Sequence, residues 1–226
     1  MVAVGCLALI SSTVAQTSKD RGLPIVVDRK EASRLAWDQA APEYPPLARV
    51  NYIQGQVRVE LLVSRDGRVV HAHVVRGQPI LAASALKATR KWLYHPLVTE
   101  TGPAPFVTSV EMNFALRYHA NQLFPLRPER DLNRQVKPPA VLTHPIDASS
   151  TSLVRLRLLL NDKGQVIDSE PLDGVAEDFG AAEKIVQHWT FDPAYWGSLP
   201  VPWYLDVEVP VADPTVHQAA GDPGSR

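Results

Sequence analysis

The sequence has little of several features on which common classes of protein depend. Cys6 is the only cysteine in 226 residues, which excludes an internal disulfide and a metal site built from thiols. No apolar run reaches the roughly 18 residues of a membrane-spanning helix. A formal net charge of −1 argues against a general nucleic-acid-binding protein. With 45% hydrophobic residues, the chain is nevertheless able to build a core.

Motifs for chemistry are also missing. The chain has no Gly-x-Ser-x-Gly, no Gly-rich phosphate loop and no His-Glu-x-x-His. His71 and His73 form a metal-like pair, but zinc needs a third ligand that no sequence neighbour offers, so we interpret them as a solvent-facing strand pair. We predict no catalytic residue, no cofactor and no metal site, and therefore no enzyme. An enzyme with its site between two parts of the chain stays open as an alternative.

Proline, by contrast, is abundant. The chain has 20 prolines, about 9% against a usual value near 5%. Because proline interrupts helices and central strands, we expect short elements with prolines at their ends.

Residues 1–15 are typical of an export signal. They are small and apolar, Thr13-Val14-Ala15 resembles a small-residue cleavage site, and Gln16 begins a polar stretch. We predict a signal peptide over 1–15. A buried N-terminal strand or helix is the alternative, and a true start upstream of Met1 would instead allow an anchored chain.

The chain contains an internal repeat. Residues 42–112 align without a gap on residues 139–209 at a constant offset of 97. The matched identities include Gly67 with Gly164, Gly77 with Gly174, Trp92 with Trp189, Pro96 with Pro193, and Pro105 with Pro202. A single offset kept over this length indicates a duplicated unit.

Each copy shows the same order of elements. Residues 57–63 alternate apolar and polar side chains, and Asp66-Gly67 is a hairpin signal before a second alternating run at 68–76. Apolar residues at helical spacing follow over 79–92, and a third strand pattern covers 105–112. We predict an α+β fold of two tandem β-β-α-β units, each a three-stranded antiparallel sheet with a helix packed on one face.

These patterns divide the chain into segments. The predicted boundaries are a signal peptide at 1–15, an N-terminal segment with a short helix at 16–41, a first unit at 42–114, a Pro-rich charged linker at 115–138, a degenerate second unit at 139–210 and a disordered tail at 211–226. The linker is expected to lie over the surface because it combines prolines with charged side chains.

The two copies differ in charge. Residues 42–114 hold eight Lys/Arg against five Asp/Glu, net +3, and residues 139–210 hold four against eleven, net −7. Opposite potentials would favour docking of one copy on the other, or would steer each copy toward a different partner. Solvated faces that diverged after duplication are the alternative.

The motifs of the first copy follow one another in a recognisable order. Glu43-Tyr44-Pro45-Pro46-Leu47 leads into the first strand, and the Asp66-Gly67-Arg68-Val69 hairpin, an Ala-rich helix ending at Trp92 and a closing strand come next. Together they resemble the C-terminal domain of TonB, the energy-transducing protein of Gram-negative envelopes. The resemblance covers about 42–114. It extends to 139–210 only through the repeat, because Leu142-Thr143 stand where Tyr-Pro is expected.

The resemblance implies a non-enzymatic periplasmic module, anchored in the inner membrane if the true start lies upstream. In that family the last strand accepts an extended peptide from an outer-membrane receptor, and an exposed sheet edge suits such strand addition. The implied partner is an envelope protein or peptide, and the implied role is TonB-dependent energy transduction or transport across the outer membrane. The candidate contacts are Tyr44, Pro45, Phe106, Val107, Thr108, Ser109 and Val110.

A different use of this edge stays open. The closing strand of one copy would pair with the other copy or with a second chain. The protein would then be a structural envelope protein that self-associates through its sheet edges.

Overall fold

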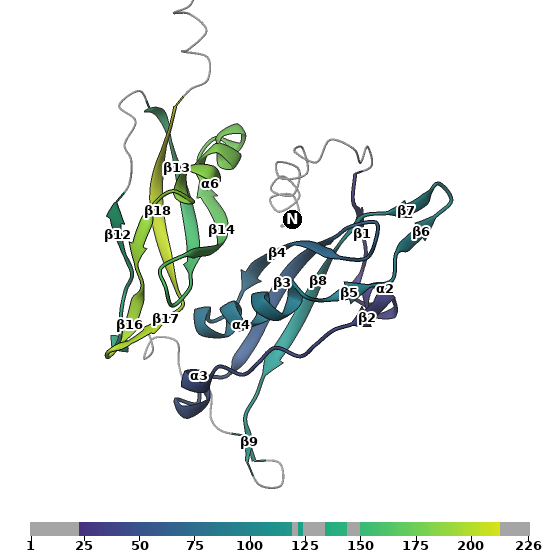
Figure 1. Cartoon of the computed structure of the whole chain (residues 1–226), viewed down its shortest axis with the longest axis horizontal. Coiled ribbons are helices and arrows are strands. Elements are labelled where there is room, and N and C mark those ends of the chain that lie inside the picture. The colour runs from purple at the N-terminus through teal and green to yellow at the C-terminus, as the bar shows by residue number, and fades with distance from the viewer. Residues whose placement is uncertain (1–22, 119–121, 124–133, 144–149, 213–226) are drawn as a thin grey trace, which may run out of the picture.

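The computed structural model describes residues 23–118, 122–123, 134–143 and 150–212 (Figure 1). They form a mixed α+β structure of several small sheets and short helices, so the predicted class is confirmed. No helix among these residues combines the length and the apolar character needed to cross a membrane. The predicted signal peptide at 1–15 and residues 213–226 of the predicted tail lie outside the described residues.

Three antiparallel strands and one helix form the centre of the first unit. These elements are β3 (Gly55–Val63), β4 (Val69–Arg76), α4 (Pro79–Thr89) and β8 (Phe106–Phe114), with β5 (Leu93–Tyr94), β6 (Leu97–Thr99) and β7 (Gly102–Ala104) between α4 and β8. Alternate side chains of β3, such as Val57 and Leu61, are fully buried, and α4 buries Leu81 and Leu86 in the same cluster. Trp92 belongs to this cluster, as expected for a core residue.

This sheet has a fourth strand that the sequence analysis did not predict. Strand β1 (Ile25–Val26) pairs in parallel with the start of β8, which gives the strand order β1-β8-β3-β4. The prediction of a three-stranded antiparallel sheet is therefore wrong for the first unit. The physical reason is that a segment from before the unit covers part of the β8 edge, which would otherwise expose unpaired backbone groups.

The second unit is a separate antiparallel sheet with the strand order β14-β13-β18. Its elements are β13 (Ser150–Leu160), β14 (Val166–Asp173), a 3-10 turn η1 (Ala176–Asp178), α6 (Phe179–Val186), β15 (Thr190–Asp192), β16 (Ala194–Trp196), β17 (Leu199–Val201) and β18 (Trp203–Ala212). Helix α6 packs on all three strands of the sheet. Val154, Leu158, Val186 and Trp189 lie in the core between them.

The elements of the two units lie 97 residues apart. Strand β4 spans 69–76 and β14 spans 166–173, and β6 and β7 stand in the same relation to β16 and β17. The hairpin glycines correspond as well, because Gly67 and Gly164 both have positive φ, +81° and +73°. A Cβ on either glycine would overlap a strand carbonyl oxygen, that of Tyr94 or that of Phe191.

Short elements surround the two units. They are α2 (Arg29–Leu35), β2 (Ala36–Asp38), α3 (Pro46–Val50), β9 (Arg117–Tyr118), β10 (Gln122–Leu123), β11 (Val136–Lys137) and β12 (Ala140–Thr143). The expected short helix has its counterpart in α2. The described part of the expected linker contains paired strands, because β9 pairs with β10 and β11 pairs with β16.

Candidate functional site

The β8 edge on which a partner was expected carries a strand of the same chain. The N–H of Ile25 donates to the carbonyl of Pro105 at 3.0 Å, and the N–H of Val27 donates to the carbonyl of Val107 at 2.9 Å. In this register Ile25 lies beside Phe106. Strand β1 is therefore a parallel strand addition to the start of β8.

Two features at the end of β1 fix its position. Val27 is 4% exposed and belongs to the core of the first unit, whereas the preceding Val26 is 70% exposed. Asp28 then caps α2, because its Oδ1 accepts a hydrogen bond from the N–H of Glu31 at 2.8 Å. The buried side chain of Val27 and the helix cap at Asp28, both just after β1, thus hold the docked strand in place.

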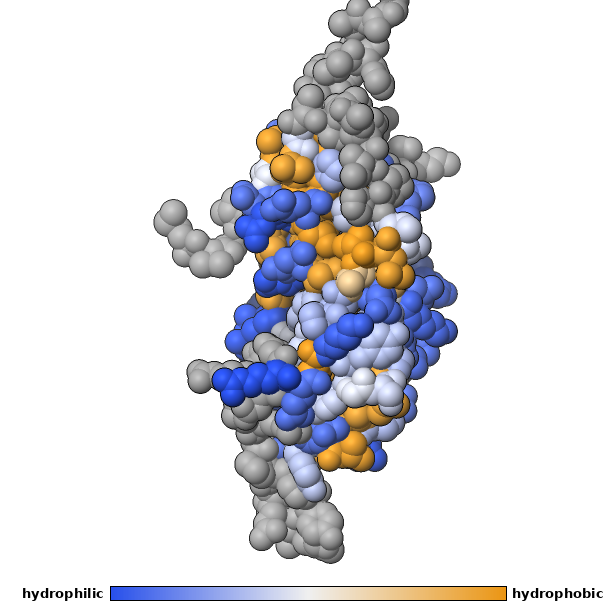
Figure 2. Space-filling model, turned by 90° about the vertical axis from the view of Figure 1, so that its left-hand side faces the viewer, coloured by the Kyte–Doolittle hydropathy of each residue, from blue (hydrophilic) through white to orange (hydrophobic). Residues whose placement is uncertain are grey.

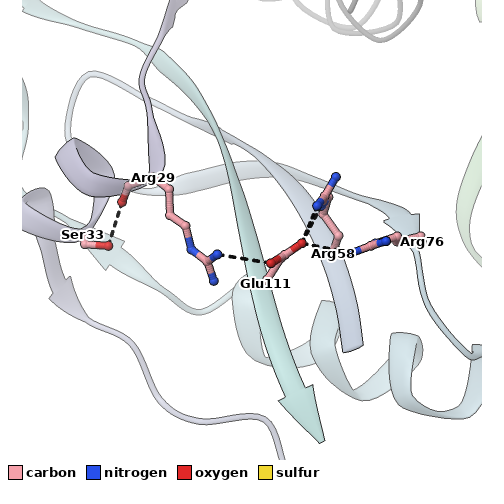
Figure 3. Close-up of polar contacts among 5 residues, drawn as sticks. All are labelled: Arg29, Ser33, Arg58, Arg76 and Glu111. Atoms are coloured by element: carbon pink, nitrogen blue, oxygen red, sulfur yellow. Dashed lines mark hydrogen bonds and ion pairs between the residues drawn. The ribbon is translucent and has the colours of Figure 1, made fainter. Parts of the chain in front are cut away.

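The carboxylate of Glu111 in β8 binds Arg29, the residue that follows Asp28 (Figure 3). Glu111 accepts hydrogen bonds from Arg29 of α2 at 3.2 Å, from Nε of Arg58 at 2.9 Å and from Arg76 at 3.1 Å. The hydrogen bond from Arg58, with smaller contributions from Arg76 and Arg29, lowers the pKa of Glu111. The three guanidinium groups come from α2, β3 and β4, so Glu111 joins the start of α2 to the sheet.

The five predicted contacts of β8 are mostly core residues. Phe106 meets Tyr94 edge-on at a ring distance of 5.6 Å, and Val107 is buried with Leu62 on the other face of the sheet. Thr108 is buried, Val110 is half-buried, and Ser109 is exposed. Since few of these side chains reach solvent, the start of β8 presents mainly backbone groups at this edge.

Tyr44 and Pro45 lie at the other end of β8. The Tyr44 hydroxyl donates to the carbonyl of Ile53 at 2.6 Å, and its ring meets Phe114 edge-on at 5.6 Å. Pro45 precedes α3 at the N-cap position. The structure therefore does not bring this pair together with Phe106 at the β1 contact.

The opposite edge of the sheet, β4, contacts the second unit. The carboxylate of Asp168 in β14 accepts a hydrogen bond from the N–H of Val74 at 2.7 Å, and its other oxygen lies 3.1 Å from Nδ1 of His73. The two side chains of the His73–Asp168 pair are 9% and 8% exposed. The interpretation of His71 and His73 as a solvent-facing pair is thus wrong for His73, because a strand of the second unit covers it.

The environment of His73 affects its protonation. Burial acts to lower the pKa of His73, but the hydrogen bond to Asp168 and the charges of Asp168, Glu170 and Glu60 outweigh it and raise the pKa. Burial lowers the pKa of His71, the neighbouring histidine. Among the described residues, no group of three or more His, Cys, Asp or Glu side chains is placed to hold a metal ion.

Further contacts join the units, and residues of both units line a cleft of about 1190 Å³. Arg90 donates to the carbonyl of Ile167 at 2.6 Å, and the Tyr204 hydroxyl donates to the carbonyl of Gly77 at 3.2 Å. Two ion pairs lie in the cleft wall, that of His73 with Asp168 and that of Arg157 with Asp206 at 2.8 Å. These contacts hold the two units together.

The second unit has a strand edge equivalent to that of β8. Strand β18 starts 97 residues after β8, and within the described residues it pairs with β13 alone. Figure 2 shows the side of the molecule on which the second unit lies, where apolar patches alternate with polar ones. Exposed apolar side chains of this part of the chain are Leu142, Leu153, Leu172, Val175 and Leu199.

Comparison with known proteins finds a family match on the first unit. Residues 40–116 match the family described as Gram-negative bacterial TonB protein C-terminal. The first unit is similar to the C-terminal domain of TonB. The solution NMR structure of the Pseudomonas aeruginosa TonB C-terminal domain matches with 20% identity and a TM-score of 0.33, covering 38% of this chain and 88% of that chain. No curated protein matches the sequence.

Sequence reasoning on this TonB-like unit missed β1, Val27, Glu111 and the His73–Asp168 pair. A signal for β1 was present, because Ile25-Val26-Val27 is an aliphatic run followed by Asp28 and, three residues later, Glu31. This spacing predicts a strand that ends at a capped helix. No comparable local signal links His73 to Asp168, which is 95 residues away along the chain.

Proposed function

We propose that this protein is a non-enzymatic, exported TonB-like protein that binds an envelope partner by adding a strand of that partner to the edge of β8. The partner class we favour is an outer-membrane receptor or a peptide segment of one. The role would be energy transduction or transport across the outer membrane. Residues 106–110 of β8 would be the contact, with residues 42–114 and 139–210 as two copies of one unit, the second degenerate.

The observation that carries this proposal is the position of β1. An extended segment already lies against β8 in parallel, held by backbone hydrogen bonds from Ile25 and Val27. Strand addition works through the main chain, and buried positions along the edge provide specificity. The family match of residues 40–116 supports the same function.

Site-specific photo-crosslinking in the native host tests the proposal. A photoreactive residue at Ser109, which is exposed on β8, should crosslink to an envelope protein that mass spectrometry identifies as an outer-membrane protein. The matched control is Val98, which is also exposed but lies on β6 of the same unit. Crosslinks of equal yield from both positions, or none from Ser109, would contradict partner binding at β8.

The β18 edge supports a second candidate, a structural protein that self-associates. An edge that no described strand covers favours edge-to-edge pairing of two chains, and the exposed Leu153 lies opposite β18 on the next strand. Light scattering over a range of concentrations would detect a dimer. Replacing Glu208, an exposed residue of β18, by proline should abolish the dimer if β18 carries it. Glu208 is the equivalent of Glu111 and lies four residues after Tyr204, the equivalent of Val107, so its N–H faces away from β13 as the Val107 carbonyl faces away from β3. A monomer at all concentrations would exclude this candidate.

A further inference from the structure

Strand β1 is short and mostly exposed for a strand that covers a sheet edge. It has two residues, and the exposed fractions of Leu23, Ile25 and Val26 are 87%, 41% and 70%. A two-residue strand buries little apolar area, so its docking rests on two backbone hydrogen bonds and on Val27. Elements with so few buried contacts open at low free energy.

The residues around β1 define what the β8 edge accepts. The two backbone hydrogen bonds fix an extended chain in parallel to β8, beginning at Pro105. Val27 fills a buried position of the core, so an aliphatic side chain fits there. Two residues later Arg29 reaches Glu111, so a cation fits that place.

We propose that β1 occupies the partner's place, and that the segment which replaces it has the same chemistry. That segment is an extended, aliphatic strand parallel to β8, with a branched aliphatic residue at the position of Val27 and a basic residue two positions later, facing Glu111. Binding of the partner then requires release of β1. This inference rests on the proposed function, since it specifies the partner and the regulation of the same edge.

Competition by β1 has a thermodynamic consequence. If the edge is free in only a fraction of molecules, the apparent dissociation constant of a partner rises by the inverse of that fraction. Undocking β1 should therefore tighten binding of an added strand without any change in β8 itself.

The test uses the full chain and a synthetic peptide of residues 23–29, LPIVVDR, acetylated and labelled for fluorescence polarisation. Val27→Asp places a charge at the buried position and should release β1. Val26→Asp places the same charge at the exposed neighbour and serves as the matched control. We expect Val27→Asp to bind the peptide at least about tenfold more tightly than the unmodified chain, and Val26→Asp to bind as the unmodified chain does.

Ile25→Pro provides a second route, since it removes the N–H that donates to Pro105 without adding a charge. Circular dichroism checks that each variant keeps its fold. Equal peptide affinity in all variants would overturn the inference and leave strand addition at β8 intact. No binding to any folded variant would overturn both the inference and the proposed function.

Discussion

Asp168 of the second unit accepts a hydrogen bond from the backbone N–H of Val74, on the open side of strand β4. Two sheet edges, β4 and β14, thus meet through a carboxylate and not through a ladder of backbone hydrogen bonds. A charged side chain that covers an edge prevents further strand pairing there. Among the described strands, β18 and the part of β8 beyond β1 then have no strand on their outer side.

Replacing Asp168 by Asn should loosen the contact between the units. The amide loses the charge that His73 and the Val74 N–H share, and we expect a cost of about 1–3 kcal/mol in the free energy of unfolding. Urea unfolding measures this cost, and small-angle scattering measures the separation of the units. Asp162→Asn, an exposed position in the turn after β13, is the control and should match the unmodified chain. Equal stability of both variants would show that the contact contributes nothing.

The pair of His73 and Asp168 predicts that the stability of the fold depends on pH. The pKa of His73 is raised in the folded state, so His73 stabilises the fold fully below its ordinary pKa of 6.5. This contribution is lost as pH rises through the raised pKa. The groups that act on His73 are Glu60 of β3, His71 of β4, Asp168 and Glu170 of β14, and Glu183 of α6, and Arg90 acts on the neighbouring His71.

Urea midpoints from pH 5 to 9 provide the measurement for this pH dependence. Relative to His73→Gln, the unmodified chain should be stabilised at acid pH, with the difference shrinking toward alkaline pH. A difference that is constant over this range would rule out protonation of His73 as the cause.

Gly164 and Gly197, two turn glycines of the second unit, predict a matched pair of effects on stability. Gly164→Ala combines left-handed backbone strain with overlap between the new Cβ and the Phe191 carbonyl. We expect a loss of at least about 2 kcal/mol in the free energy of unfolding. Gly197→Ala has a similar φ of +63° but open space around the Cβ, so it should cost about 1 kcal/mol. Equal costs would show that strand contact is irrelevant at the hairpin.

The sequence carries enough local information to predict the units but too little to predict their surroundings. Alternation in β3 and helical spacing in α4 place Val57, Leu81 and Trp92 in the core, where the structure has them. Periodicity fails for β1, because two residues show no period, and only the aliphatic run before the Asp28 cap marks its place. They also fail for His73, because its burial depends on a strand far along the chain.

Tyr44→Phe separates a structural role from a binding role. The phenol of Tyr44 donates to the Ile53 carbonyl, so its removal should cost about 1 kcal/mol in the free energy of unfolding. Peptide binding at β8 should stay unchanged, because Tyr44 packs against Phe114 at the far end of the strand. A loss of peptide affinity with unchanged stability would instead make Tyr44 a partner contact.

Glu111→Gln tests whether charge holds β1 in place. The carboxylate ties Arg29 of α2 to Arg58 and Arg76 of the sheet, and the neutral amide loses all three ion pairs. The exposed ion pair with Arg29 is screened by solvent, so we expect hydrogen exchange at the Val27 amide to rise by only roughly two- to fivefold. Arg29→Gln should match it, because both changes break the ion pair between Arg29 of α2 and Glu111. Since the pKa of Glu111 is lowered, the difference in exchange between the unmodified chain and Glu111→Gln should disappear only as pH falls through that lowered pKa. A rise in Glu111→Gln without one in Arg29→Gln would place the effect within the sheet and leave β1 held by Val27 and its backbone hydrogen bonds.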